Sequence, residues 1–167
     1  MLTILIGVPG SGKTTKAQTM MGEYCEADQY PYLYRDGRLQ GGLLTIAHQD
    51  CQHRVESLMR QGMPVIQSNT NLNLNHMMPY FQLAQQYNYG VQLVLPSHDL
   101  LHYPHTLSRD EQKDVLYSIR SSPDSDHLIP PSVMIGMIRS FDRIKAQIQH
   151  RLHVTNPTDW IRWIGSL

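Results

Sequence analysis

The sequence predicts an α/β fold with a parallel sheet of about five strands flanked by helices, and three observations predict it. Apolar runs of strand length lie at 2–6, 63–68 and 90–96. Between them, apolar residues recur at three- and four-residue steps, the pattern of helices with one buried face. A glycine-rich turn also joins the first run directly to a helical pattern. Strands that alternate with helices favour a parallel sheet with right-handed crossovers.

The first half of the chain reads as strand, helix, strand, loop and helix. After the first strand we expect a helix over 13–21 and a short strand over 24–28. Residues 29–42, rich in Tyr, Gly and Pro, predict an irregular loop. A helix over 43–60 follows from the spacing of Leu44, Ala47, Cys51, Val55 and Leu58. Gly62 is expected to end it.

The middle of the chain supplies two more strands with a helix between them. Asn73 or Asn75 can cap a helix that reaches about Tyr87. The strands on either side of it are those predicted over 63–68 and 90–96. The second of them is expected to end sharply at its proline.

The last third is less regular. Ser108 followed by Glu111 resembles a capping box and predicts a helix over 107–119. A polar, proline-broken stretch follows at 121–131. A helix over 132–151 is expected from an apolar face formed by Met134, Ile138, Phe141 and Ile144. Val154 is expected to begin a short last strand, and Trp160, Ile161, Trp163 and Ile164 are expected to pack on the domain.

Composition indicates one globular domain over 1–167. Lys+Arg and Asp+Glu number 14 each, so no overall basic charge indicates a general nucleic-acid binder. An enzyme that grips a few phosphates locally stays compatible with this balance. Cys25 and Cys51 form no CxxC pair and predict no disulfide. With no signal peptide before the first strand and no membrane-length apolar run, we expect a soluble cytoplasmic protein.

The turn after the first strand has the pattern G-x-x-x-x-G-K-[ST], which binds nucleoside triphosphates. Its glycines let successive N–H groups point at phosphate oxygens, and the next helix adds its dipole. Lys13 is expected to reach the β- and γ-phosphates of ATP, and the Thr14 hydroxyl to bind Mg²⁺. The expected nucleotide-binding residues are Gly7, Pro9, Gly10, Ser11, Gly12, Lys13, Thr14 and Thr15.

Two polar features follow neighbouring predicted strands. Asp28 ends the second strand and is the best candidate for a general base toward a hydroxyl acceptor, although a capping role stays open. Asn69, Thr70 and Asn71 follow the third strand. They either bind substrate beside the phosphate loop or stabilise their own turn. Ligands of open α/β sheets lie at this edge, beyond the carboxyl ends of the strands.

The loop after Asp28 carries candidate acceptor-binding side chains. Arg35 and Arg38 can grip an acceptor phosphate, and surface positions are the alternative. Tyr30, Tyr32 and Tyr34 alternate there. They can stack on a base or form a small core of the loop itself.

A lid is expected over about 98–131. Arg120 precedes its polar part and is the candidate that stabilises charge on the transferring phosphoryl group. Arg109 and Arg139 compete for that role, and for each a solvated arginine is the alternative.

Nine histidines raise the question of a metal site. His98, His102 and His105 are the closest set, but no HExxH or Cys/His zinc spacing is present. His48 lies in an apolar-periodic helix and is expected to pack or pair locally. We therefore expect no zinc site.

Several of these segments, in order, resemble the polynucleotide 5′-hydroxyl kinase-like P-loop ATPases and kinases. The resemblance covers about 2–145 and is strongest at Ala27-Asp28 and Asn69-Thr70-Asn71. Its other parts are Gly7 to Thr15, Tyr30, Gly37, Ala47-His48, Gly62 to Ile66, Met78-Pro79-Tyr80, Gly90 to Leu93, Pro96, His127 to Pro130 and Met134 to Asp142. It implies that Asp28 activates the acceptor hydroxyl, that Lys13 and Thr14 bind ATP and Mg²⁺, and that Arg120 is the lid arginine.

The chain also departs from that family. Ser68 and Asn69 occupy the places beside the third strand where the family carries an acid, so a Walker-B-type carboxylate is missing. Gln29 stands where a second acid often follows the catalytic one. Arg120-Ser121 replaces an expected Arg-Asn, and no DxDxT phosphatase motif exists.

These features predict ATP-dependent phosphoryl transfer to a hydroxyl of a nucleic acid or nucleotide, most specifically a polynucleotide 5′-hydroxyl. One alternative is a kinase for a hydroxymethylated pyrimidine in DNA, a nucleoside or another small hydroxyl acceptor. An alternative of a different class is an ATP-binding switch or partner-binding module with little catalysis, which the missing third-strand acid favours.

Overall fold

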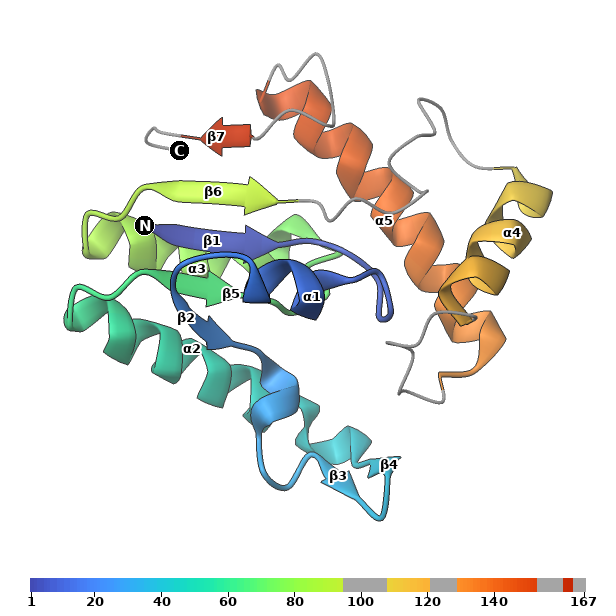
Figure 1. The fold of residues 1–167 in the computed structure, drawn as a ribbon, viewed down its shortest axis with the longest axis horizontal. Coiled ribbons are helices and arrows are strands. Elements are labelled where there is room, and N and C mark those ends of the chain that lie inside the picture. Colours follow the sequence, from blue (N-terminus) through green and yellow to red (C-terminus); the bar gives the residue numbers. More distant parts are fainter. Residues whose placement is uncertain (95–107, 121–128, 153–160, 164–167) are drawn as a thin grey trace.

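The computed structural model describes residues 1–94, 108–120, 129–152 and 161–163. Its central sheet has the order β2-β5-β1-β6-β7 (Figure 1). The parallel strands are β2 (Glu23–Cys25), β5 (Val65–Gln67), β1 (Leu2–Leu5) and β6 (Val91–Val94). The last strand, β7 (Ile161–Trp163), pairs antiparallel with β6. The predicted α/β fold is confirmed, with four parallel strands and an antiparallel edge strand.

The two faces of the sheet bury different helices, because successive side chains of a strand point to opposite faces. On one face, Leu2 and Ile4 join the large core formed with α2 (Leu44–Arg60), α3 (Leu74–Gln86) and α5 (Pro131–Leu152). On the other face, Leu5 packs with Ala17 of α1 (Lys13–Gln18) in a smaller cluster. The sheet is thus covered on both sides, as parallel sheets require.

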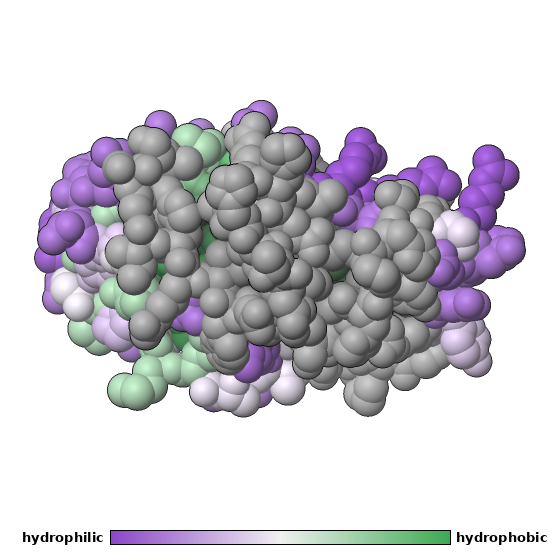
Figure 2. Space-filling model, turned by 90° about the horizontal axis from the view of Figure 1, so that it is seen from above, coloured by the Kyte–Doolittle hydropathy of each residue, from purple (hydrophilic) through white to green (hydrophobic). Residues whose placement is uncertain are grey.

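The predicted helices of the middle and end of the chain are confirmed. Asn73 caps α3, because its side chain accepts a hydrogen bond from the Asn75 N–H at 2.9 Å. Ser108 and Glu111 form the expected capping box at the start of α4 (Arg109–Arg120), which lies within the expected lid range. The helix α5 buries its predicted apolar face, formed by Met134, Ile138, Phe141 and Ile144. At the end of the molecule that carries α4, Figure 2 shows mostly hydrophilic side chains.

Two local predictions were wrong in detail. The strand predicted over 24–28 ends at Cys25, and the chain then forms the 3₁₀ turn η1 (Ala27–Gln29). The loop predicted as irregular contains a hairpin of β3 (Tyr34–Arg35) and β4 (Arg38–Leu39), followed by the 3₁₀ turn η2 (Gly41–Leu43). Strands of two residues are too short to show a hydrophobic period. The hairpin depends instead on its turn residues, which adopt positive φ.

Asp36 and Gly37 have φ values of 51° and 71° and form the two-residue connection of that hairpin. An Asp-Gly pair suits such a turn, since both residues tolerate positive φ better than most. The first helix is also shorter than expected, ending at Gln18 rather than at about Met21.

Several sequence predictions fall on residues outside the described ranges. They concern the strand start at Val154, packing by Trp160 and Ile164, and the polar stretch at 121–128. Within the described part of the chain, no helix is both long and apolar enough to span a membrane.

Candidate active site

Three sequence features meet at one edge of the sheet. β2, β5 and β1 are neighbours and parallel, and Cys25 and Ile4 both lie level with Gln67 of β5. The segments that leave the carboxyl ends of these strands are therefore close in space, although they come from three parts of the chain. They are the phosphate loop, the η1 turn with Asp28, and the turn at 68–71 (Figure 1).

The phosphate loop holds its shape through its own backbone. Gly10 and Gly12 have φ values of 74° and 79°, a conformation that favours glycine. The buried Lys13 Nζ donates hydrogen bonds to the carbonyls of Gly7 at 3.0 Å and Val8 at 2.9 Å. Burial lowers the pKa of Lys13 to about 8, an effect that the nearby carboxylates of Glu26 and Asp28 oppose.

The residues of the loop fit a triphosphate. The Ser11 hydroxyl is buried and makes no hydrogen bond within the described structure. A Cβ on Gly7 would lie 2.5 Å from Ser11 Oγ, so only glycine leaves this space open. Lys13 supplies a cation beside the loop, and Thr14 lies exposed at the start of α1. These are the donor groups and the hydroxyl that ATP and Mg²⁺ require.

Asp28 projects from the middle of the η1 turn and is exposed to solvent. Its charge acts on Lys13 and on His48 of α2. It also interacts with the Tyr34 hydroxyl: burial above all, and then the charge and hydrogen bond of Asp28, raise the pKa of Tyr34 to about 12. A carboxylate thus stands at the same edge as the phosphate loop and within its electrostatic reach.

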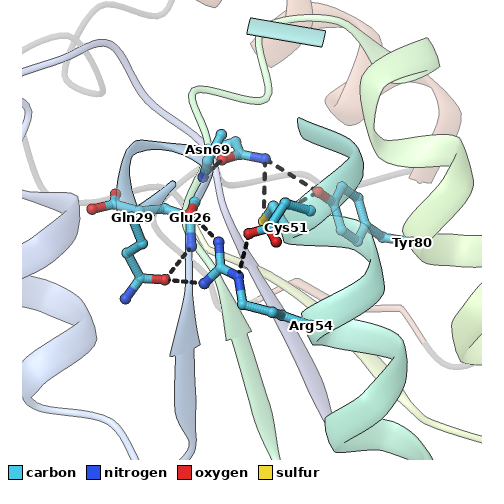
Figure 3. Close-up of polar contacts among 8 residues, drawn as sticks. Glu26, Gln29, Cys51, Arg54, Asn69 and Tyr80 are labelled. Carbon is cyan, nitrogen blue, oxygen red and sulfur yellow. Dashed lines mark hydrogen bonds and ion pairs between the residues drawn. The ribbon is translucent and has the colours of Figure 1, made fainter. Parts of the chain in front are cut away.

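Long-range hydrogen bonds hold the turn that carries Asp28 (Figure 3). Asn69 Oδ1 accepts from the Ala27 N–H at 2.8 Å, and Arg54 Nη2 of α2 donates to the Glu26 carbonyl at 2.7 Å. Gln29 Oε1 accepts from the Glu26 N–H at 3.1 Å and also from Arg54 Nη1. Arg54 is fixed in turn by an ion pair with Asp50 at 2.8 Å. We call Asn69, Arg54 and Gln29 the η1 clamp, because they hold this turn.

The Asn69 amide is oriented by this arrangement. Because its oxygen accepts from Ala27, its NH₂ group faces Tyr80 Oη at 3.2 Å, Cys51 Sγ at 3.8 Å and His48 Nδ1 at 3.4 Å. Nδ1 of His48 accepts from this NH₂ group in the tautomer that carries the ring proton on Nε2. Burial and the neighbouring His76 lower the pKa of His48.

Asn71 and Thr70 brace the phosphate loop from below. The buried Asn71 Nδ2 donates to the Leu5 carbonyl at 2.7 Å and to Gln67 Oε1 at 2.6 Å. The Thr70 carbonyl accepts from the Gly7 N–H at 3.0 Å. The sequence left open whether the residues at 69–71 bind substrate or stabilise the local structure. The contacts of both asparagine amides are with other groups of the protein, which fits a structural role.

The candidate arginines are placed differently. Arg35 and Arg38 lie directly opposite each other on the β3–β4 hairpin, both exposed. Arg109 and Arg139 are exposed on α4 and α5. Arg120 is the last residue of α4, and its side chain lies outside the described structure.

A zinc site at the histidines can be examined only among the residues that the structure describes. His98, His102 and His105 lie outside the described residues. Among the residues that the structure does describe, no three His, Cys, Asp or Glu side chains are grouped as a metal site.

The site predicted from the sequence does not include Arg54, Tyr24, Glu26 or Tyr80. Arg54 had a detectable signal: it stands three residues after Cys51 and four after Asp50, on a helix whose apolar period was recognised. Tyr24 Oη donates to Glu26 Oε2 at 2.6 Å and lies 3.4 Å from Thr14 Oγ1. Nothing in the sequence indicates that this pair reaches the phosphate loop.

The chain is similar to known proteins in sequence and in fold. The sequence model of the AAA domain family AAA_33 matches residues 2–103. Human NEDD4-binding protein 2 is 34% identical over 96 residues, which are 54% of this chain and 5% of that protein. The chain therefore spans only a small fraction of that relative's length.

Two solved structures are similar in shape. A Chloroflexus aurantiacus protein named a "putative kinase" has a TM-score of 0.52 and 15% identity, over 83% of this chain and 77% of that one, which supports the fold. A chain of the Pnkp1/Rnl/Hen1 complex has 21% identity and a TM-score of 0.49, over 64% of this chain and 40% of that one, a similarity too low to carry an argument. By the family match, which covers more than half of its residues, the chain belongs to the AAA domain family AAA_33.

Proposed function

We propose that the protein is an ATP- and Mg²⁺-dependent kinase that phosphorylates a 5′-hydroxyl of a polynucleotide. One observation carries this proposal: the η1 clamp holds the turn that carries the exposed Asp28 at the same edge of the sheet as the phosphate loop. A fixed carboxylate beside a triphosphate site is what an attacking hydroxyl requires. Residues 1–167 would form one kinase domain, with a lid over about 98–131 that includes α4.

The reaction follows from the roles of these groups. The acceptor O–H gives its proton to the Asp28 carboxylate, its oxygen bonds to the γ-phosphorus of ATP, and the bond from that phosphorus to the β,γ-bridging oxygen breaks to release ADP. Lys13 and the backbone N–H groups of the loop bind the phosphates. Thr14 would hold Mg²⁺, which when bound offsets negative charge on the β- and γ-phosphates.

The hairpin supplies the acceptor side of the proposal. Arg35 and Arg38 are cross-strand neighbours, and like charges that face each other across two strands repel. A phosphate of the acceptor strand between them would relieve that repulsion. Tyr32, 69% exposed, lies in the chain that leads from Asp28 to the hairpin and offers a ring for stacking on a base. We keep Arg120 as the proposed lid arginine.

An acceptor screen tests the proposal. Transfer of labelled phosphate from ATP would be compared among 5′-hydroxyl DNA and RNA oligonucleotides, 5′-phosphorylated DNA with hydroxymethylated pyrimidines, and free nucleosides. We expect transfer to the 5′-hydroxyl oligonucleotides. Transfer only to the modified DNA or the nucleosides would replace this acceptor with one of the alternatives.

The variant Asp28→Asn should lower the transfer rate about 10²- to 10⁴-fold, the usual contribution of a general base. Asp36→Asn is the matched control, because Asp36 is an exposed acid on the nearby hairpin at a φ of 51° that asparagine also adopts. Equal transfer by wild type and Asp28→Asn would disprove the role of Asp28.

The absence of an acid after β5 favours one second candidate, an ATP-binding switch. The residues at that position are Ser68 and Asn69. Binding of ATP that changes affinity for a partner, without transfer to any acceptor in the screen, would support this alternative.

A further inference from the structure

The phosphate loop has an acid beside it that comes from a different strand than the family pattern predicts. β2 and β5 are parallel neighbours in which Cys25 lies level with Gln67, so the next residues, Glu26 and Ser68, leave the sheet at the same level. The Ser68 N–H donates to the Cys25 carbonyl at 2.9 Å, which continues the pairing to this point. The carboxylate absent at position 68 is thus present one strand away, at position 26.

A chain of hydrogen bonds connects this acid to Thr14. Tyr24 Oη donates its only proton to Glu26 Oε2 at 2.6 Å. The contact of 3.4 Å between Thr14 Oγ1 and Tyr24 Oη therefore has Thr14 as its donor. When the Thr14 hydroxyl donates a hydrogen bond to Tyr24, the lone pairs of its oxygen point away from Tyr24 and are available to a cation.

This is the arrangement that a metal-binding hydroxyl requires. Groups that hydrogen-bond to a metal ligand fix its orientation and raise its donor strength. The charge of Glu26 also acts on the Lys13 ammonium, ahead of that of Asp28. Ser68 adds a buried hydroxyl that interacts with Tyr24 from the neighbouring strand.

We propose that Tyr24 and Glu26 are positioning residues for the Mg²⁺ site at Thr14, and that Glu26 replaces the acid that the chain lacks after β5. The inference rests on the proposed binding of ATP with Mg²⁺. It does not require any particular acceptor.

The test measures metal binding rather than turnover. Binding of Mn²⁺ would be followed by electron paramagnetic resonance in the presence of a non-hydrolysable ATP analogue, and binding of a fluorescent analogue would be followed with and without metal. Tyr24→Phe keeps the ring and removes the hydroxyl, whereas Glu26→Gln keeps the shape and removes the charge. Glu23→Gln, an exposed acid at the start of the same strand, is the matched control.

We expect Tyr24→Phe and Glu26→Gln to weaken Mn²⁺ binding about 10- to 100-fold, the usual effect of losing a partner of a metal ligand. Affinity for the metal-free analogue should stay unchanged, and Glu23→Gln should bind Mn²⁺ as wild type does. Adding Ser68→Asp to Glu26→Gln should restore Mn²⁺ affinity, because positions 26 and 68 are level on adjacent strands.

Wild-type Mn²⁺ affinity in both Tyr24→Phe and Glu26→Gln would overturn the inference. Equal losses of affinity with and without metal would also overturn it, since they would indicate damage to the phosphate loop. The proposed function and this inference can fail separately. If the two variants lose Mn²⁺ affinity as predicted but the wild-type protein phosphorylates no acceptor, the proposed function is disproved and this inference stands.

Discussion

The phosphate loop and the η1 turn lie at the same edge of the sheet, but the side chains that hold them come from different distances along the sequence. Lys13 binds carbonyls five and six residues away, and the loop's glycines supply its unusual backbone angles. The η1 turn is held by Asn69, 42 residues from Ala27, and by Arg54, 28 residues from Glu26. The comparison teaches that the side chain of Lys13 and the glycines shape the phosphate loop locally, with Thr70 as an outside support. The η1 turn adds to its local Glu26–Gln29 contact two bonds that depend on the packing of α2 and β5.

Among changes that separate the two halves of the site, the largest effect is expected from breaking the clamp at Asn69. Asn69→Leu leaves the buried Ala27 N–H without its acceptor, which costs about 1–3 kcal/mol in the free energy of unfolding. Displacement of the turn by about 1 Å would lower the transfer rate about 10²-fold. Urea denaturation and rate measurements check both, with ATP-analogue affinity as the internal reference. If that affinity fell as far as the rate, the two halves of the site would not be separable.

A substitution within the phosphate loop should weaken ATP binding and leave the acceptor side unchanged. In Gly7→Ala the new Cβ would lie 2.5 Å from Ser11 Oγ, so the buried Ser11 hydroxyl or the loop around it must shift. Overpacking of this kind costs about 2 kcal/mol, which corresponds to about 30-fold in ATP affinity. The acceptor KM should not change. The double variant Gly7→Ala with Ser11→Ala removes the clashing oxygen and should recover part of the affinity, and failure to recover would place the cause elsewhere.

Arg54→Met tests the second arm of the clamp. The substitution removes the donor to the Glu26 carbonyl and the partner of Asp50. We expect a loss of about 10- to 20-fold in transfer rate through misplacement of Asp28. Arg60→Met is the control on the same helix, because its ion pair with Glu56 lies at the surface, where such pairs contribute little to stability. Similar rates for the two variants would contradict a clamp role for Arg54.

The smallest expected effect is the pH dependence that Lys13 gives to stability and to ATP-analogue binding, which tests the phosphate loop alone. Burial lowers the pKa of Lys13 to about 8, so the native protein loses this proton near pH 8 while the unfolded chain keeps it to higher pH. Between pH 8 and the usual lysine pKa, the unfolded state binds more protons, and the contribution of Lys13 to the free energy of unfolding rises with pH.

Phosphate binding should change in the opposite direction, because it depends on the charged form. A lysine with a pKa of about 8 in the free protein predicts about tenfold weaker binding of the ATP analogue at pH 9 than at pH 7. Lys13→Arg, which keeps its charge, should show a flat profile over this range, even if its affinity is lower. A flat profile in the wild type would contradict the assigned pKa.

Sequence alone identified the elements whose signals are local. The phosphate loop, the helices with regular apolar spacing and the caps at Asn73 and Ser108 were all predicted, because each depends on residues within a few positions of one another. Asp28 was recognised as a candidate, but it was assigned to the end of a strand. The 3₁₀ turn on which it lies combines a local capping box of Glu26 and Gln29 with hydrogen bonds from Asn69 and Arg54. No local pattern shows that Asn69 and Arg54 are its partners.

The amino-acid sequence by itself determined the class of the fold, the nucleotide-binding loop and the chemical types available for a kinase reaction. The tertiary structure alone decided which groups meet: that β2 lies beside β5, that Glu26 is level with Ser68, and that Tyr24 connects Glu26 to Thr14. The direction of β7 was likewise decided by pairing with β6. The physical reason is the range of the interactions: backbone propensity and capping act between near neighbours, whereas strand order brings together residues that no spacing in the sequence connects.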